Sequence, residues 1–268
     1  MRWWAYSGYL LWAQVAILPC TPTRIAVDEL GHLYAWCDTE KALLKLWPPR
    51  YDSLTRIGGG PASREGFFEV TSLAPIGNQQ LYVLDVGRQA LFLLGTNLQV
   101  LQKIRFEEMA PELWRGFPTH LSVMPGGDLF IALRETQEIV RVDAFGRILV
   151  RFGGKITGPA SLVRIQDLQA NETFLTVLDQ GYQLKVFDPW GSLLSTIVLP
   201  STTQFCVLGR QNLLYKTPTE WLYLPDLRQP SQKYPLSDLP MLLPTAGYLT
   251  KTHFYYAKGQ ALFVYPLP

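Results

Sequence analysis

The sequence has little charge of either sign. Only 17% of its 268 residues are charged, and 24 Lys and Arg against 22 Asp and Glu leave a net charge of +2. Binding to a nucleic-acid backbone depends on many Lys and Arg contacts to phosphates, and this chain has no comparable excess of positive charge. We therefore expect no nucleic-acid partner.

Cysteine is scarce as well. Cys20, Cys37 and Cys206 have neither the spacing of metal ligands nor that of a disulfide framework. Isolated cysteines of this kind are most often buried free thiols, which is our first expectation. The alternative is a bridge between Cys20 and Cys37, because the strand assignment given below brings both to the same end of neighbouring strands.

The short motifs of nucleophilic and nucleotide-binding enzymes are also missing. The sequence has no Gly-x-Ser-x-Gly elbow and no cysteine beside a suitable histidine partner. The glycine clusters at 58–60 and 153–154 are not followed by the Lys-Ser/Thr pair that a phosphate-binding loop requires. We interpret them as turns between repeats and expect no cofactor.

The apolar segment that opens the chain is too short to span a membrane. Residues 1–20 contain a single charged residue and end at Pro19, whereas a spanning helix needs about 20 apolar residues. A basic start and an apolar centre are typical of a secretory signal. We expect a signal peptide over residues 1–13, cleaved after Ala13, and an exported protein that is periplasmic, outer-membrane-associated or secreted. Lipidation at Cys20 and an uncleaved segment packed on the domain are the alternatives.

Strand-forming residues and turn residues are abundant, and they are arranged in a repeat. Many Leu, Val, Tyr, Phe and Trp, with 21 Gly and 20 Pro, favour short strands joined by tight turns. Three segments share one pattern of alternating strand, Gly-containing turn and alternating strand, namely 23–36, 71–84 and 120–133. The equivalent residues Ile25, Leu73 and Leu121 are 48 positions apart both times. This regular spacing indicates a repeat architecture.

Each repeat has room for four antiparallel strands, which is the content of one propeller blade. A third strand opens ten residues after the second at Leu43, Leu91 and Ile139. The fourth copy keeps this step after a first turn around Asn171 that we take to be longer, and the last two copies are shortened. The expected fold is all-β, a six-bladed β-propeller forming a single domain over residues 14–268. Its blades are expected to start near 23, 70, 119, 160, 203 and 241.

The sixth copy ends at Pro268 directly after its third strand. A missing fourth strand would leave backbone groups unpaired at an outer edge and would leave the ring open. Residues 15–18 have strand character and lie directly before the first blade. We expect residues 14–20 to provide the closing strand, paired with residues 261–265.

One stretch of the fourth copy resembles the NHL-type repeat. Residues 176–194 contain a strand ending in Asp179, a turn, a strand ending in Phe187-Asp188 and a glycine turn, while 134–152 and 83–104 are weaker versions. The resemblance implies the propeller fold but not one function. Proteins of this kind serve as protein-binding platforms, RNA binders, lyases and lactonase-like enzymes.

Enzymes of the resembling family hold metal ligands where the innermost strands begin, at the top of the central channel. In this sequence those positions lie near Thr23, Glu69, His120, Ser161, Gln204 and Thr245. Only Glu69 and His120 at this channel mouth are ordinary metal ligands, whereas a catalytic site commonly uses three, so we expect no metal. The alternative for His120 is a strand-end residue bonded to backbone. His32 and His253 are expected at the opposite face, which excludes the three-histidine zinc centre of the related amidating lyases.

Two long crossings between blades, 58–69 and 107–119, carry aromatic residues and arginines. These residue types on loops are typical of interface hot spots. The candidate partner-binding residues are Arg64, Phe67, Phe68, Arg88, Trp114, Arg115 and Phe117. The alternative is that the aromatic side chains fold inward and fill the spaces between blades.

The leading functional hypothesis is an exported, non-catalytic propeller that acts as a protein–protein interaction or scaffold module in a cell-envelope complex. Its partner would be another protein or a peptide, with membrane association through that partner or through the N-terminus. The alternative is a metal-dependent lyase or lactonase-like hydrolase with its site at the top of the central channel, around Glu69 and His120.

Overall fold

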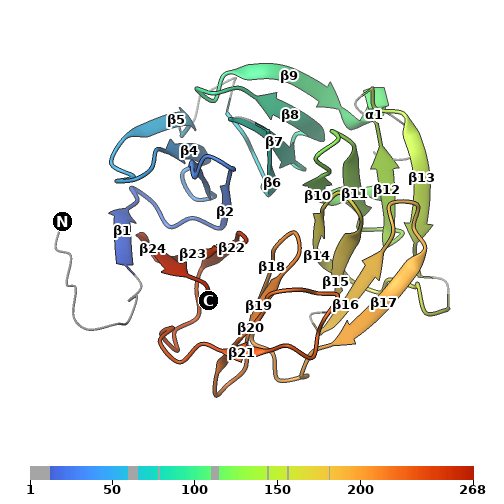
Figure 1. Cartoon of the computed structure of the whole chain (residues 1–268). Helices are drawn as coiled ribbons and strands as arrows, with labels where there is room; N and C mark the ends of the chain where they lie inside the picture. Colours follow the sequence, from blue (N-terminus) through green and yellow to red (C-terminus); the bar gives the residue numbers. More distant parts are fainter. Residues whose placement is uncertain are drawn as a thin grey trace.

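The computed structural model describes residues 13–59, 66–77, 79–109, 115–143, 145–155, 157–180 and 182–268. The described strands form six four-stranded antiparallel sheets arranged around a central axis (Figure 1). This arrangement confirms the six-bladed β-propeller. Residues 1–12, which hold most of the expected signal peptide, and the candidate residues Arg64 and Trp114 lie outside the described part of the chain.

The strands of each blade follow one another from the channel outwards. Blade one has β2 (Arg24–Val27), β3 (Leu33–Cys37), β4 (Ala42–Leu46) and β5 (Leu54–Gly58). Blade two has β6 (Val70–Ile76), β7 (Gln80–Asp85), β8 (Ala90–Leu94) and β9 (Val100–Arg105). Blade three has β10 (Pro118–Val123), β11 (Leu129–Leu133), β12 (Glu138–Val142) and β13 (Ile148–Gly153).

The remaining blades repeat this order, and the strands of blade five are the shortest. Blade four has β14 (Ile165–Ala170), β15 (Leu175–Asp179), β16 (Gln183–Phe187) and β17 (Leu193–Val198). Blade five has β18 (Phe205–Leu208), β19 (Leu213–Lys216), β20 (Trp221–Leu224) and β21 (Tyr234–Pro235). Blade six has β22 (Ala246–Leu249), β23 (His253–Lys258) and β24 (Ala261–Pro266), and its fourth strand is β1 (Ala13–Ile17).

The N-terminal strand closes the ring, as expected from the sequence. β1 pairs antiparallel with β24, with Gln14 opposite Phe263 and Ile17 opposite Ala261. The first and last parts of the chain therefore share blade six (Figure 1). The pairing gives β24 a partner on the side that would otherwise expose a free edge.

The hydrophobic core lies between the blades. The second strand of each blade is buried on both faces, as in β3, β11 and β15, where every residue is buried. The clusters of buried side chains join neighbouring blades: one of them brings Trp36 of blade one against Phe67 and Phe92 of blade two. The outermost strands are largely exposed, which explains why their sequences are the most polar and the least regular.

A disulfide reinforces the closure. Cys20, which follows β1, is bonded to Cys37 at the end of β3, and their Cα atoms are 6.0 Å apart. The expectation of buried free thiols is wrong for this pair, because both residues are buried at the same end of neighbouring segments. Cys206 is a free thiol, as expected, but it is only partly buried. The bond ties the closing segment to blade one, so the join between the first and last blades is covalent.

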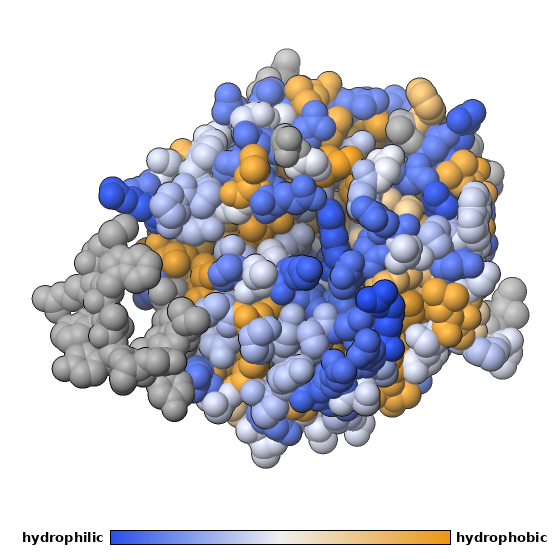
Figure 2. Space-filling view, in the orientation of Figure 1, coloured by the Kyte–Doolittle hydropathy of each residue, from blue (hydrophilic) through white to orange (hydrophobic). Residues whose placement is uncertain are grey.

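α1 (Phe106–Met109) is a single helical turn at the crossing from blade two to blade three, where Arg115 and Gly116 are helical as well. Within the described part of the chain, no helix is long and apolar enough to cross a membrane. On the face shown in Figure 2, hydrophobic residues occur in small groups separated by hydrophilic ones.

Candidate functional site

The central channel is divided along its length into two cavities. The upper cavity, of about 570 Å³, lies where the innermost strands begin, and the lower cavity, of about 580 Å³, lies where they end. A space of only about 10 Å³ separates them, and Tyr248 lines all three. Polar residues of all six blades reach the upper cavity: Thr23, Arg24, Thr71, Ser72, His120, Arg164, Gln166, Asp167, Gln169, Gln180, Tyr182, Ser201, Thr203, Gln204, Cys206, Thr245 and Tyr248.

Three neighbouring innermost strands are irregular at the same point. β6, β10 and β14 each have a β-bulge directly before Ser72, His120 and Asp167, respectively. In blade one, Arg24 takes the same place, one residue before the buried Ile25. Bulges turn a side chain away from its regular direction and are frequent beside active sites. Four consecutive blades thus place a polar side chain at equivalent positions around the upper cavity.

His120 is held as a neutral imidazole. Its Nδ1 atom is 3.1 Å from the hydroxyl oxygen of Thr119. Burial lowers the pKa of His120 to about 4, the nearby Arg24 guanidinium acts in the same direction, and a hydrogen bond to the backbone of Gln166 opposes them. The ring therefore links blade three to blade four without carrying a charge at neutral pH.

The pKa of Asp167 is raised, in contrast to that of His120. Burial raises the pKa of its carboxyl from 3.8 to about 6, although the backbone N–H of Leu168 donates to Oδ1 at 2.8 Å and Arg24 is nearby. A carboxyl with a pKa near neutrality can both take up and release a proton at working pH. Burial, with the charge of Asp167, raises the pKa of the Cys206 thiol, so this cysteine stays protonated and is a poor nucleophile.

Two arginines add positive charge to the upper cavity. Arg24 donates from Nε to the carbonyl of Thr71 at 3.0 Å and from Nη1 to its neighbour Thr23 at 2.8 Å. Among the described residues, neither Arg24 nor Arg164 forms an ion pair. Among the described residues that line this cavity, Asp167 is the only carboxylate, so cations outnumber anions there.

The structure separates the two residues that the sequence placed together at the channel mouth. His120 lines the upper cavity, whereas Glu69 lines a side pocket of about 230 Å³ with Phe117 and Arg134. The sequence placed the start of blade four near Ser161, but β14 begins at Ile165. The carboxyl that shares the cavity with His120 is consequently Asp167, which sequence reasoning missed. His253 lines the lower cavity.

The candidate partner-binding residues fall in different environments. Phe67 is 3% exposed and packs edge-on against Phe92, so it cannot reach a partner; the alternative of an inward aromatic holds for it. Phe68 and Phe117 are 60% and 45% exposed. Arg88 has its Nε atom 3.8 Å from Asp85 of the same turn, which places it against its own blade.

Three candidates are exposed: Phe68, Arg115 and Phe117. Arg115 is helical and lies shortly before β10. The rings of Phe68 and Phe117 are each covered by a cation of the chain itself, with Lys41 5.6 Å and Arg134 5.4 Å from the ring centroids. The ring of Phe68 therefore faces Lys41 of blade one and that of Phe117 faces Arg134 of blade three. Binding of a partner by these residues stays a prediction, and Arg64 and Trp114 are outside the described residues.

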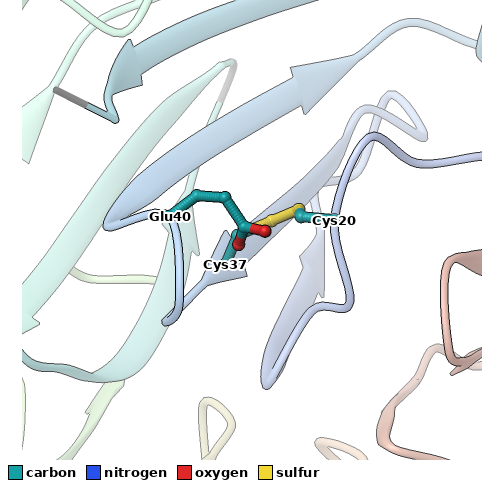
Figure 3. Close-up of side chains that lie close together, drawn as sticks. All are labelled: Cys20, Cys37 and Glu40. Atoms are coloured by element: carbon teal, nitrogen blue, oxygen red, sulfur yellow. A yellow bond between two sulfur atoms is a disulfide. The ribbon is translucent and has the colours of Figure 1, made fainter.

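A metal centre requires several ligand atoms in one place, and the upper cavity does not supply them. In the described part of the chain, one group of three candidate ligands lies within 4.8 Å: Cys20, Cys37 and Glu40 (Figure 3). The two sulfurs are bonded to each other and cannot serve as thiolate ligands. The described lining of the upper cavity offers one imidazole, His120, and one carboxylate, Asp167, whereas a usual catalytic site has three protein ligands.

The sequence matches no known family model and no curated protein, but the fold is shared with solved structures. A selenomethionine-substituted virginiamycin B lyase from Staphylococcus aureus is 12% identical, with a TM-score of 0.58 over 94% of this chain and 98% of that one. A streptogramin B lyase is 12% identical, with a TM-score of 0.58 over 90% and 77%. A catalytically inactive histidine-to-alanine virginiamycin B lyase from Staphylococcus aureus, with quinupristin, is 11% identical, with a TM-score of 0.56 over 91% and 80%.

At these identities the likeness establishes the propeller fold, and the NHL-type character of the repeat stays a prediction. The comparison nevertheless corrects the leading functional hypothesis. We expected a non-catalytic interaction module, whereas the solved structures that share this fold are enzymes. The alternative hypothesis was a metal-dependent lyase or lactonase-like hydrolase, and its lyase reading agrees better with these structures.

Proposed function

We propose that the protein is a lyase-type enzyme that acts in the upper cavity, with Asp167 as the proton acceptor. The observation that carries this proposal is that Asp167, His120 and Arg24 line one cavity, where burial raises the pKa of Asp167 to about 6 and keeps the imidazole neutral. Perturbed titratable groups that converge on a cavity are typical of active sites. The lyases that share the fold support the reaction class, and one of them is inactive after loss of a histidine.

An elimination needs a base and a place for the displaced electrons. Asp167 would take a proton from a carbon next to a carbonyl group, and the electrons of that C–H bond would form a carbon–carbon double bond. The bond between the neighbouring carbon and an oxygen leaving group would then break. Asp167 would return its proton to that oxygen, so the reaction consumes no water or other reactant.

Arg24 would stabilise the negative charge that develops on the carbonyl oxygen. Its Nε and Nη1 atoms are fixed by backbone carbonyls, which leaves the N–H groups of Nη2 for a ligand. A cation held in place before the reaction does not need to reorganise as the charge develops. The same charge lowers the pKa of His120, which indicates that the Arg24 guanidinium acts across the cavity.

His120 is a positioning residue in this scheme. Its hydrogen bond to the Gln166 backbone fixes the strand at the residue before Asp167. Because the imidazole stays neutral, it does not pair with the carboxylate, and a charged imidazole would lower the pKa of Asp167 and weaken it as a base. Replacement of His120 by alanine should therefore change the pH profile as well as the rate.

The test is an assay with quinupristin, the compound present in one of the similar structures, and with a panel of small esters and lactones. Product mass in water labelled with heavy oxygen separates the reaction classes, because elimination adds no oxygen and hydrolysis adds a labelled one. We expect an unlabelled, unsaturated product. Asp167→Asn should lower turnover at least about 100-fold, the usual range for loss of a general base. The exposed Asp52→Asn is the matched control; full turnover by Asp167→Asn would refute the proposal.

We also propose that the protein is exported. The Cys20–Cys37 bond supports this, because structural disulfides persist mainly in oxidising compartments. Cleavage after Ala13 would leave Gln14 as the first residue, within the closing strand β1. Mass spectrometry of the protein from its native source, after alkylation of free thiols, would find one alkylated cysteine and a mature start at Gln14. Three alkylated cysteines and an intact Met1 would contradict export.

A further inference from the structure

We infer that the upper cavity recognises a carboxylate group on a small organic ligand, through Arg24, Arg164 and Gln204. This inference rests on the proposed function in one respect, since the carboxylate would be part of the substrate. It goes further because it specifies the chemical class of that substrate. The three residues come from blades one, four and five, so they approach the cavity from different sides.

The charge of the lining favours an anion. Arg24 and Arg164 have no ion-pair partner among the described residues, and Asp167 is the single carboxylate opposite them. Both arginine side chains are exposed and line the cavity, and Asp167 is near enough to Arg24 to offset part of its charge. A guanidinium offers paired N–H groups that match the two oxygens of a carboxylate.

A buried lysine behind the cavity wall fixes the third residue. Lys216 is 2% exposed, and its Nζ atom donates to Gln204 Oε1 at 3.1 Å and to the carbonyl of Thr217 at 2.9 Å. Lys216 forms no ion pair with the described residues, so its charge adds to the positive potential of the cavity.

This contact determines which end of the Gln204 amide is available. Because Oε1 accepts from Lys216, the Nε2 group remains as a pair of N–H donors. Gln204 is itself exposed and lines the upper cavity. Its free donors and the two guanidinium groups are therefore complementary to an acceptor-rich, negatively charged group.

A carboxylate also suits the proposed chemistry. A proton on the carbon next to a carboxylate is hard to remove, because the resulting species carries two negative charges. Cations that contact the same carboxylate lower this cost. Arg24 could therefore bind the ligand and stabilise the reacting state through one contact, and it lies near enough to Asp167 to affect the pKa of that carboxyl.

The experiment is titration calorimetry with succinate, dimethyl succinate and inorganic phosphate as probes. We expect succinate to bind at least about tenfold more tightly than its neutral diester, the scale of charge-assisted hydrogen bonds. Arg164→Gln should weaken succinate binding about tenfold. Gln204→Glu should do the same while keeping an acceptor for Lys216, so that the fold is preserved. Lys251→Gln, an exposed residue of the lower cavity, is the matched control and should have no effect.

Asp167→Asn separates this inference from the proposed function. The variant loses the proton acceptor but keeps all three anion-binding residues, so it should bind succinate at least as tightly as the natural protein. Succinate binding with unchanged turnover in Asp167→Asn would refute the proposed function alone. Equal binding of succinate and its diester, tighter binding of phosphate than of succinate, or an unaffected Arg164→Gln variant would overturn the carboxylate inference.

Discussion

Replacement of Asp167 by asparagine should stabilise the protein at neutral pH while it removes activity. Burial raises the pKa of Asp167 from 3.8 to about 6, so the folded protein holds the charged form less readily than the unfolded chain. One pKa unit corresponds to about 1.36 kcal/mol, which gives an upper bound of about 3 kcal/mol for the cost of the charge. Water in the open cavity screens part of it, and we expect a gain of about 1–2 kcal/mol.

The sign of the pH dependence follows from the direction of the shift. Because the folded-state pKa lies above the unfolded value, the cost is fully present above about pH 6 and falls away toward pH 3.8. Below that pH both states are protonated, and asparagine offers no advantage. The side-chain oxygen of asparagine can still accept the Leu168 N–H, so the local backbone contact is kept.

Urea unfolding at pH 7.5 and at pH 4 measures this difference directly. In thermal unfolding at pH 7.5, the same gain in free energy of unfolding corresponds to a rise in Tm of roughly 2–8 °C for a domain of this size. At pH 4 the gain should be much smaller. The exposed Asp52→Asn is the control and should be neutral at both pH values. A loss of stability at pH 7.5, or the same gain at both pH values, would show that Asp167 is not held against its preferred charge state.

Three further predictions concern stability. Because the pKa of His120 is lowered to about 4, the folded state loses stability as the pH falls from 6.5 to 4, and His120→Asn should flatten this limb of a plot of Tm against pH. Reduction of the Cys20–Cys37 bond should cost about 3 kcal/mol in urea unfolding, whereas replacement of the third cysteine should leave the effect of reductant unchanged. Phe67→Ala should cost about 3–5 kcal/mol and Phe68→Ala less than about 0.5 kcal/mol by the same measurement; similar costs would contradict the inward placement of Phe67.

The repeat could be read from the sequence because burial imposes a regular pattern on it. The second strand of each blade is enclosed by its neighbours, so Leu33, Leu81 and Leu129 recur at a fixed spacing. The outer edge of β24 requires a strand partner, and residues 15–18 had the strand character to supply it. Fold and closure were thus predictable from hydrophobic periodicity and backbone hydrogen bonding.

The site was only partly predictable, because it depends on bulges. A bulge places two residues of one strand opposite a single residue of its partner, so a repeat alignment that assumes regular strands misplaces the residues beside the bulge. In blade four we took the first turn to be longer, whereas its backbone bond joins Asn171 to Phe174 and the matching bond in blade three joins Met124 to Asp128. An alignment that used this shorter turn would have placed Asp167 of blade four at the position equivalent to His120 of blade three.

The sequence also did not show which side chains of the crossings between blades are buried and which are exposed. Phe67 and Phe68 are adjacent in the sequence, yet one is buried between blades and the other is exposed. The difference is set by Asp85, whose carboxylate accepts the backbone N–H groups of Phe68 and Glu69 at 2.8 and 3.0 Å and so fixes the chain as it enters blade two. Composition alone cannot distinguish these two neighbours, because both belong to the same loop and the same residue type.

The disulfide that closes the ring also holds the backbone segment that carries Arg24 of the upper cavity. Arg24 starts the innermost strand of blade one, four residues after Cys20, and its guanidinium is bonded to the carbonyl of Thr23. Thr23 is in turn bonded through its N–H to the carbonyl of Trp36, directly before Cys37. The disulfide therefore constrains both ends of the backbone segment that holds Arg24. Asp167 lies in blade four, three blades from the disulfide. Reduction of the disulfide should therefore displace the Arg24 guanidinium before it displaces the Asp167 carboxylate.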